Sequence, residues 1–158
     1  TYSGLFLSGV KINTTKSIPL GGYWESEEPV KKGAYVLWCP PKSDLFDDAK
    51  NRGYVGGGFC PGGYGYLMKR ILAAENDVLT VDDTGVFVNG ELLNYSRPRK
   101  ADKFNRPMPE YRVSRYTLKK GELLFMSDVS ETSFDGRYYG LVDASHVVAV
   151  IEPVFTWQ

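Results

Sequence analysis

The sequence predicts a mostly β fold made of antiparallel sheets with one short helix. The chain includes 11 tyrosines and is 14% aromatic, and aromatic side chains favour strands. It also contains 17 glycines and 9 prolines, which suit the turns between short strands. The third observation is that short apolar runs, each of strand length, recur between these turn residues. At 158 residues the chain can bury a substantial core, and we expect one domain over 1–158.

Most of the expected strands end at glycine, proline, asparagine or aspartate. They cover residues 4–13, 34–39, 65–74, 77–81, 86–93, 111–118, 123–127 and 147–155. Residues 14–23 should form a further strand that runs into a turn at Pro19 and Gly21-Gly22. Asn89-Gly90 is a strong hairpin signal. These short strands make residues 76–118 a candidate small β extension within the domain.

Residues 42–52 are the helix candidate. Ser43 is an expected N-cap, aspartates crowd the first turns, and Gly53 closes the segment. The basic, proline-interrupted segment 96–109 is expected to be an exposed loop.

Composition excludes several classes of function. The 19 basic and 19 acidic residues balance, which argues against a nucleic-acid surface. The glycine loop 56–63 lacks the Gly-Lys-Ser/Thr ending of a phosphate-binding loop, so no nucleotide site is expected. Two cysteines and one histidine are too few for an ordinary structural zinc site. That histidine, His146, precedes an expected strand, and a Ser-His-Asp triad would depend on it alone.

Lys69 lies in the middle of the apolar run 65–74. With a period of two it shares a face with Leu67, Ile71 and Ala73, and this face should be buried. Burial would lower the pKa of the amine, the adjacent Arg70 would act in the same direction, and a neutral lysine can serve as a general base. The alternative is a strand-end lysine whose amine reaches water along a buried stem.

Two further clusters carry hydroxyl groups. Ser17 stands just before Pro19, where a turn can expose a hydroxyl and its backbone N–H, although such residues are also ordinary turn material. In the late polar segment Ser133, Asp135 and Arg137 occupy alternate positions. Asp135 and Arg137 could pair, and Ser133 could offer a hydroxyl to an amine. The alternative is a solvated loop with a weak surface ion pair.

Taken in order, these clusters resemble the type I signal peptidases. In that family a nucleophilic serine precedes a proline turn, a lysine base followed by arginine lies on an apolar strand, and a late box carries a serine, an aspartate and an arginine. The matching segments here are Ser17-Ile18-Pro19, Met68-Lys69-Arg70-Ile71, Ser127-Asp128 and Ser133 to Gly140, with similar connecting segments at 31–36 and 88–91.

The departures from the family pattern point to one branch. The serine-proline motif is one residue shorter than usual, and the late box has Ser127, Val129 and Ser130 where glycine, asparagine and arginine are expected. The form Ser17-Ile18-Pro19-Leu20-Gly21-Gly22-Tyr23 resembles the conjugative-transfer branch, the TraF-type peptidases.

The resemblance implies a signal-peptidase/LexA-like β fold and a serine endopeptidase without a cofactor or metal. Ser17 would be the nucleophile and Lys69 its base. The Ser17 backbone N–H and the Thr15 hydroxyl would hold the oxyanion. The supporting residues would be Ser133, which orients the amine, the Asp135–Arg137 brace, Arg70 and Asp128.

The branch also implies a location and partners. Its members are membrane-anchored, periplasm-facing proteases that mature conjugative pilin precursors, and some of them join the pilin ends into a ring. We therefore expect a pilin precursor as substrate, the conjugative transfer machinery as partner, no nucleic acid, and an inner-membrane anchor upstream of Thr1. In an oxidising periplasm, Cys39 and Cys60 are disulfide candidates, with two buried thiols as the alternative.

Two other functions stay open at this point. A LexA-type self-cleaving protease uses Ser-Lys chemistry on a related fold, but it would need an internal scissile bond and usually a DNA-binding domain, neither of which is visible. In a non-enzymatic β module of a secretion assembly, all three clusters would be ordinary turns.

Overall fold

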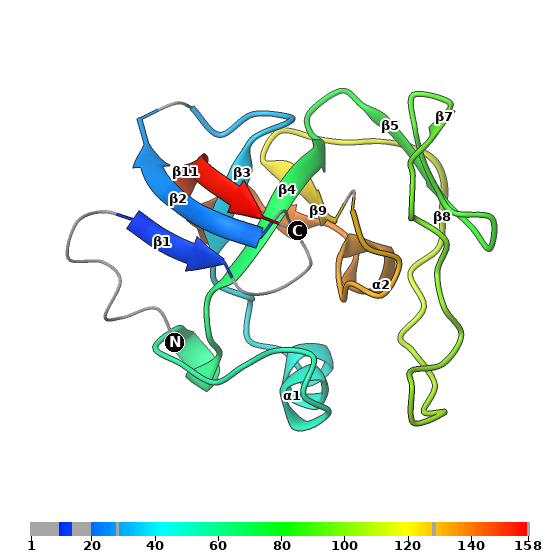
Figure 1. Ribbon diagram of the computed structural model, residues 1–158. Coiled ribbons are helices and arrows are strands. Elements are labelled where there is room, and N and C mark those ends of the chain that lie inside the picture. Colours follow the sequence, from blue (N-terminus) through cyan, green and yellow to red (C-terminus); the bar gives the residue numbers. More distant parts are fainter. Residues whose placement is uncertain (1–9, 14–19, 28, 128, 158) are drawn as a thin grey trace.

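The computed structural model describes residues 10–13, 20–27, 29–127 and 129–157, and these form two antiparallel β-sheets with short helices beside them (Figure 1). In spatial order the larger sheet contains β1 (Val10–Asn13), β2 (Leu20–Ser26), β11 (Val147–Trp157), β3 (Tyr35–Trp38), β4 (Leu67–Ala73), β9 (Glu122–Met126) and β10 (Val142–Asp143). The smaller sheet contains β7 (Glu91–Leu92), β6 (Val86–Val88), β5 (Val78–Val81) and β8 (Val113–Thr117). The mostly antiparallel β class expected from the sequence is confirmed.

Strand β4 lies inside the larger sheet, between β3 and β9. Its register places Lys69 opposite Val36 of β3, and a register shift follows Ile71 where β4 pairs with β9. Ile71 packs in one core cluster, whereas Met68 packs in a separate cluster with Leu37. The period-two reading is confirmed as far as Ile71, since Leu67 and Ile71 pack in one cluster and Met68 in another. It fails after the register shift, where the adjacent Leu72 and Ala73 pack in the same cluster.

Strand β9 separates two parts of the core. Leu123 and Phe125 join the aromatic cluster around Trp38, and Leu124 and Met126 join the cluster that underlies the smaller sheet. Because both of its faces are covered, β9 reads in the sequence as a continuous apolar run rather than as an alternating one.

The smaller sheet spans residues 78–117, inside the candidate extension 76–118. Its hairpin between β6 and β7 turns at Asn89 and Gly90, whose φ angles are 53° and 84°. Positive φ at both positions is the requirement of a type I′ turn, so the hairpin signal in the sequence is confirmed.

Helix α1 (Asp44–Asn51) agrees with the sequence: the Ser43 side chain accepts a hydrogen bond from Phe46 N at 3.1 Å. The expectation of one helix is incomplete, because α2 (Gly136–Tyr139) adds a single turn, and η2 (Pro61–Gly63) and η3 (Ala144–His146) add 3₁₀ turns. Four residues are too few to show a helical period. In the described part of the chain, no helix has the length and apolar character needed to cross a membrane.

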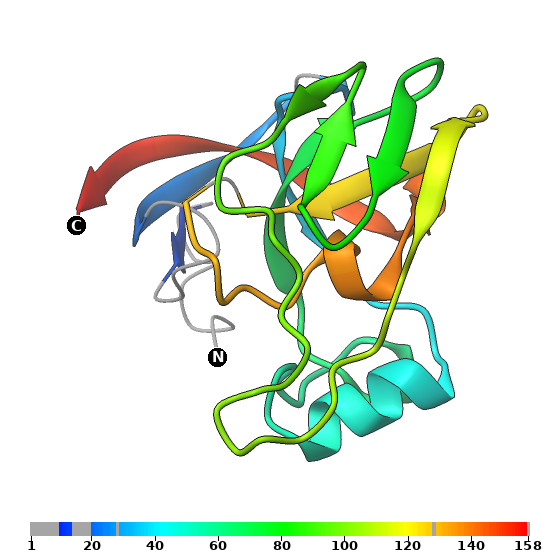
Figure 2. The same ribbon diagram turned by 90° about the vertical axis from the view of Figure 1, so that its right-hand side faces the viewer.

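One loop prediction is wrong, and another holds only in part. Gly21 and Gly22 do not form a turn but lie within β2, where both pair with β1. The segment 96–109 is not simply exposed: Ser96 is 2% exposed, and its hydroxyl accepts from Val86 N and donates to Leu93 O. Residues 94–112, which we call the strap, run from β7 past α2 toward α1 and return to β8 (Figure 2).

A disulfide joins Cys39, just after β3, to Cys60 in the glycine loop, with the two Cα atoms 5.6 Å apart. The bridge expected from the sequence is present. Within this loop Gly58 lies so close to Gly65 that a Cβ on residue 58 would be only 2.8 Å from Gly65 Cα. The bridge therefore fixes a compact loop against the end of the sheet that carries β3 and β4.

Removing the bridge should destabilise the fold. The bonded cysteines are 21 residues apart, and on the chain-entropy model a loop of this size contributes about 3 kcal/mol. The variant Cys39→Ala/Cys60→Ala should lose about that much free energy of unfolding in a urea titration. Dithiothreitol should lower wild-type stability to the same level and leave the variant unchanged. Two free thiols in denatured, unreduced wild type would contradict the bridge.

Candidate active site

The Lys69 amine is buried inside the protein and bound to a hydroxyl. The residue is 4% exposed, and its Nζ donates to Ser133 Oγ at 2.8 Å. Ser133 is itself 6% exposed. The snorkelling alternative is therefore wrong: the amine does not reach water along its stem. The structure brings together Lys69 of β4 and Ser133, which are 64 positions apart in the sequence.

Burial changes the protonation of this lysine. Desolvation lowers the pKa of Lys69 to about 8, while Asp135 raises this pKa and Arg137 lowers it. The cation that acts on Lys69 is thus Arg137, not Arg70 as the sequence suggested. Arg70 turns elsewhere: its Nε donates to Gly33 O at 3.0 Å, and its guanidinium lies 5.1 Å from the centre of the Tyr35 ring.

Asp135 and Arg137 form an ion pair in which both side chains are fully buried. Arg137 Nε donates to Asp135 Oδ1 at 2.8 Å, and Nη2 donates to Oδ2 at 2.9 Å. Asp135 also caps α2 by accepting from Arg137 N, and it accepts from Ser127 N at the end of β9. The alternative of a solvated loop with a surface ion pair is therefore wrong.

Gly136 allows this arrangement. A Cβ at this position would lie 2.5 Å from Leu124 Cδ1 and 2.9 Å from Phe125 O of β9. Only a glycine lets the first turn of α2 approach the strand so closely. This close approach places the Asp135 carboxylate within 3.1 Å of Ser127 N.

The remaining donors of Arg137 bind backbone carbonyls. Nη1 donates to Glu131 O at 3.1 Å and to Arg97 O of the strap at 3.3 Å, and Nη2 donates to Ser130 O at 3.2 Å. Sequence reasoning missed the strap as a neighbour of the site. No residue pattern could have shown it, because a carbonyl acceptor is the same for every residue type.

The expected nucleophile lies outside the described residues. Ser17 and Thr15 fall in 14–19, and Asp128 is also not described. The described part of the site therefore consists of Lys69, Ser133, Asp135 and Arg137. Among the described residues, no group of three histidine, cysteine or acidic side chains could hold a metal ion.

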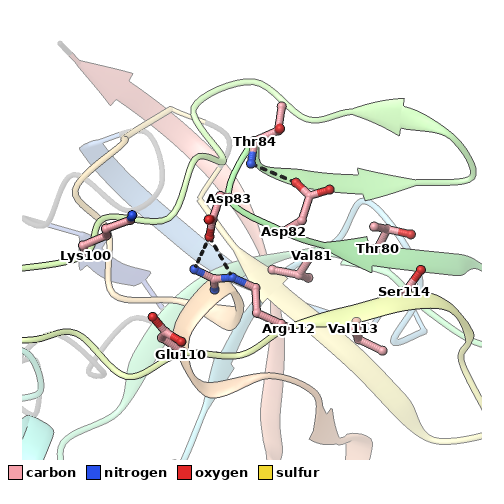
Figure 3. A pocket seen from close by; sticks show the side chains of 10 residues that line it. All are labelled: Thr80, Val81, Asp82, Asp83, Thr84, Lys100, Glu110, Arg112, Val113 and Ser114. Atoms are coloured by element: carbon pink, nitrogen blue, oxygen red, sulfur yellow. Dashed lines mark hydrogen bonds and ion pairs between the residues drawn. The ribbon is translucent and has the colours of Figure 1, made fainter.

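A surface hollow of about 830 Å³ lies elsewhere, on the smaller sheet and the strap (Figure 3). None of the four site side chains lines it. Its lining is polar, and Arg112 Nη2 donates to Asp83 Oδ1 at 3.0 Å across it. The charged side chains that line this hollow are exposed, and it lacks the buried titratable group that proton transfer needs, so we place the chemistry at Lys69.

The burial of Lys69 should reduce stability below pH 8. The unfolded chain keeps its lysine protonated to about pH 10.4, whereas the folded protein releases this proton near pH 8, so stability rises with pH between these values. At pH 7 the variant Lys69→Met should unfold with a free energy about 2–3 kcal/mol larger than wild type. The difference should shrink at pH 10. Urea titrations at both pH values measure it, and a less stable variant at pH 7 would contradict the argument.

Comparisons with known proteins agree along nearly the whole chain. The sequence profile of the family described as "Signal peptidase, peptidase S26" matches residues 10–157. A plasmid transfer protein TraF of Escherichia coli is 60% identical over 155 residues, which cover 98% of this chain and 87% of that protein. A conjugal transfer protein TraF of Agrobacterium fabrum is 31% identical over 161 residues, which cover 100% of this chain and 88% of that protein.

Among solved structures, a signal peptidase I from Enterococcus faecalis aligns with 80% of this chain and 100% of that chain, at 15% sequence identity and a TM-score of 0.45. The family assignment rests on the sequence profile and on the relatives that align over almost the full length. From these, the chain belongs to the peptidase S26 family of signal peptidases and is a relative of the TraF conjugal transfer proteins.

Proposed function

We propose that this peptidase is a serine endopeptidase in which Lys69 is the general base for Ser17. The observation that carries the proposal is the buried Lys69 amine, held at 2.8 Å by Ser133 and with a pKa of about 8. A lysine with this pKa is neutral in a useful fraction of molecules near neutral pH, so it can accept a proton from a hydroxyl. Family membership supports a peptidase.

The reaction would run through an acyl-enzyme. Neutral Lys69 accepts the proton of Ser17 Oγ as this oxygen attacks the scissile carbonyl. The Ser17 backbone N–H and the Thr15 hydroxyl stabilise the oxyanion. The ammonium of Lys69 then gives its proton to the leaving amine as the peptide bond breaks. Lys69 next deprotonates a water molecule, which attacks the ester. The bond from the acyl carbon to Ser17 Oγ breaks, and Lys69 returns the proton to this oxygen.

Ser133 and the Asp135–Arg137 pair would act on the base rather than on the substrate. The Ser133 hydroxyl accepts from the amine, which directs the remaining positions of Nζ away from Ser133. Asp135 stabilises the ammonium that forms when Lys69 takes up the proton, since its charge raises this pKa. Arg137 opposes this effect, which increases the fraction of the resting amine that is neutral.

The substrate proposed is a conjugative pilin precursor, with the transfer machinery as partner. Relatives named as plasmid and conjugal transfer proteins support this choice. The Cys39–Cys60 disulfide supports an oxidising compartment, and we place the domain in the periplasm. The same proposal includes an inner-membrane anchor, which the family resemblance supports.

Cleavage of a candidate pilin precursor should increase with pH through about 8, because only the neutral amine of Lys69 accepts a proton. Ser17→Ala and Lys69→Ala should both be inactive, and Lys69→Arg should fail as well, since a guanidinium does not deprotonate in proteins. The exposed Lys31→Arg is the matched control and should cleave at the wild-type rate. Near-normal cleavage by Lys69→Arg would exclude the base role.

We further propose that the acyl-enzyme can be resolved by an amine instead of water. Lys69 would deprotonate the substrate's own N-terminal amine as it attacks the ester and forms a peptide bond. The bond from the acyl carbon to Ser17 Oγ breaks, and Lys69 returns the proton to this oxygen. A tethered amine can exceed millimolar effective concentration and so compete with water. The product would then be a ring.

Intact-mass spectrometry tests this step, since a ring is lighter than the matching linear product by one water. A full-length precursor should yield some or all of its product as the ring, and a short peptide without the N-terminus should be hydrolysed. If the full-length precursor in membranes gives the linear product alone, the ring-closing step is wrong, while cleavage by Ser17 and Lys69 is unaffected.

A further inference from the structure

The strap is fastened to the rest of the protein at its tip. Its two limbs are bridged between Ala101 and Pro107, which closes a small hairpin. This hairpin meets the chain just after α1, where Arg52 Nη1 donates to Pro107 O at 2.6 Å and Tyr54 donates its hydroxyl proton to Asp102. Figure 2 shows the strap descending past α2 toward α1.

Asp102 is the centre of this attachment. Its side chain is 7% exposed and accepts from Arg106 Nε at 2.7 Å, and from the backbone N of Phe104 and of Arg106 at 2.9 Å each. Burial opposes its ionisation, but the hydrogen bonds from Tyr54 and Arg106 outweigh burial and hold the pKa of Asp102 well below its usual range. The carboxylate is therefore an ionised, rigid acceptor for the Tyr54 hydroxyl at neutral pH.

The Tyr54 ring connects Asp102 to the aromatic side chains beside Ser133. It packs on Phe134 with the ring centroids 5.1 Å apart. Phe134 also stacks on Tyr138, at 5.9 Å with 4° between the planes. Tyr138 is tied to the strap as well, since its hydroxyl accepts from Arg99 N at 3.0 Å. Phe134 directly follows Ser133, the residue that holds the Lys69 amine.

We propose that Tyr54, held by Asp102, is a positioning residue for the peptidase reaction: it holds the Phe134 ring and thereby sets Ser133 against the Lys69 amine. The proposal rests on the proposed role of Lys69 as the base. The line of contacts runs from Asp102 to Tyr54, then to Phe134, then to Ser133. The first step is a hydrogen bond, the second a contact between two rings and the third a peptide bond, and the strap is thus part of the site's support.

The Ser133 loop is held by Arg137, which binds the carbonyls of Ser130 and Glu131, and by the ring of Phe134, which follows Ser133. Residues 131 and 132, just before Ser133, are exposed, whereas the side chains from Ser133 to Tyr138 are buried. The aromatic contacts of Phe134 therefore fix where the loop enters the core. A shift of about 1 Å at a catalytic group can reduce the rate a hundredfold, so a small displacement of Ser133 would be measurable.

The direct test is Tyr54→Phe, which keeps the ring on Phe134 and removes only the hydroxyl bound to Asp102. We expect kcat on a fixed peptide substrate to fall about three- to tenfold with KM unchanged. Asp102→Asn should behave similarly, and the double variant should be no worse than the poorer single one, since both break the same contact.

A second readout separates positioning from a general loss of stability. Among the described residues, the groups that bind or electrostatically affect Lys69 are Ser133, Asp135 and Arg137. A looser Ser133 loop would admit water to the amine. The acid limb of the kcat–pH profile should therefore move to higher pH in Tyr54→Phe. Amide hydrogen exchange should accelerate at residues 133–139 and stay unchanged in β3 and β4.

The matched control is Asp83→Asn, which breaks the exposed ion pair between Asp83 and Arg112 at the other end of the strap (Figure 3). It should leave kcat, the pH profile and the exchange of 133–139 at wild-type values. The proposal is overturned if Tyr54→Phe lowers the melting temperature but leaves kcat and the acid limb unchanged, or if KM alone rises.

Failure of the proposed function is recognised separately. If Lys69→Arg cleaves at the wild-type rate, the base role is wrong whatever Tyr54→Phe does. The positioning role of the Tyr54–Asp102 contact is then judged by amide hydrogen exchange: faster exchange of 133–139 in Tyr54→Phe supports it, and unchanged exchange overturns it.

Discussion

The candidate site depends on the buried pair of Asp135 and Arg137. Removing one member of such a pair typically costs about 3–5 kcal/mol, because the other charge is left buried without compensation. Here the guanidinium is compensated by the carboxylate and by the carbonyls of Arg97, Ser130 and Glu131. Since these carbonyls come from both the strap and the Ser133 loop, the pair holds together two segments that β8 and β9 separate in the sequence.

The burial of Lys69, in contrast, favours the reaction and lowers the stability of the fold. A protonated amine in this environment is unfavourable, and the pKa of about 8 expresses that penalty. Strand β4 holds the Lys69 amine in this environment, because β4 lies inside the sheet with β3 and β9 on either side. A side chain on an interior strand has little freedom to move toward water, so the sheet keeps the amine poorly hydrated.

The smaller sheet and the strap give the extension a role beyond that of a surface appendage. Its cluster of Leu79, Val81, Val86 and Val88 joins the core through β9. From this anchored base the strap reaches α2 and the end of α1, where Tyr54 and Asp102 meet. The extension thus connects one edge of the fold to the loop that carries Ser133.

The sequence alone determined the features that depend on local pattern: the β class, α1 with its Ser43 cap, the Asn89-Gly90 turn and the buried face of Lys69. It also determined which residue types could supply the chemistry. Only the tertiary structure decided that Ser133 meets Lys69, that Arg137 rather than Arg70 acts on the amine, and that the strap supports the site. These contacts join residues tens of positions apart, often through backbone carbonyls or aromatic faces. Periodicity and capping depend on residues that are close in the sequence, so neither pattern can reveal such long-range contacts.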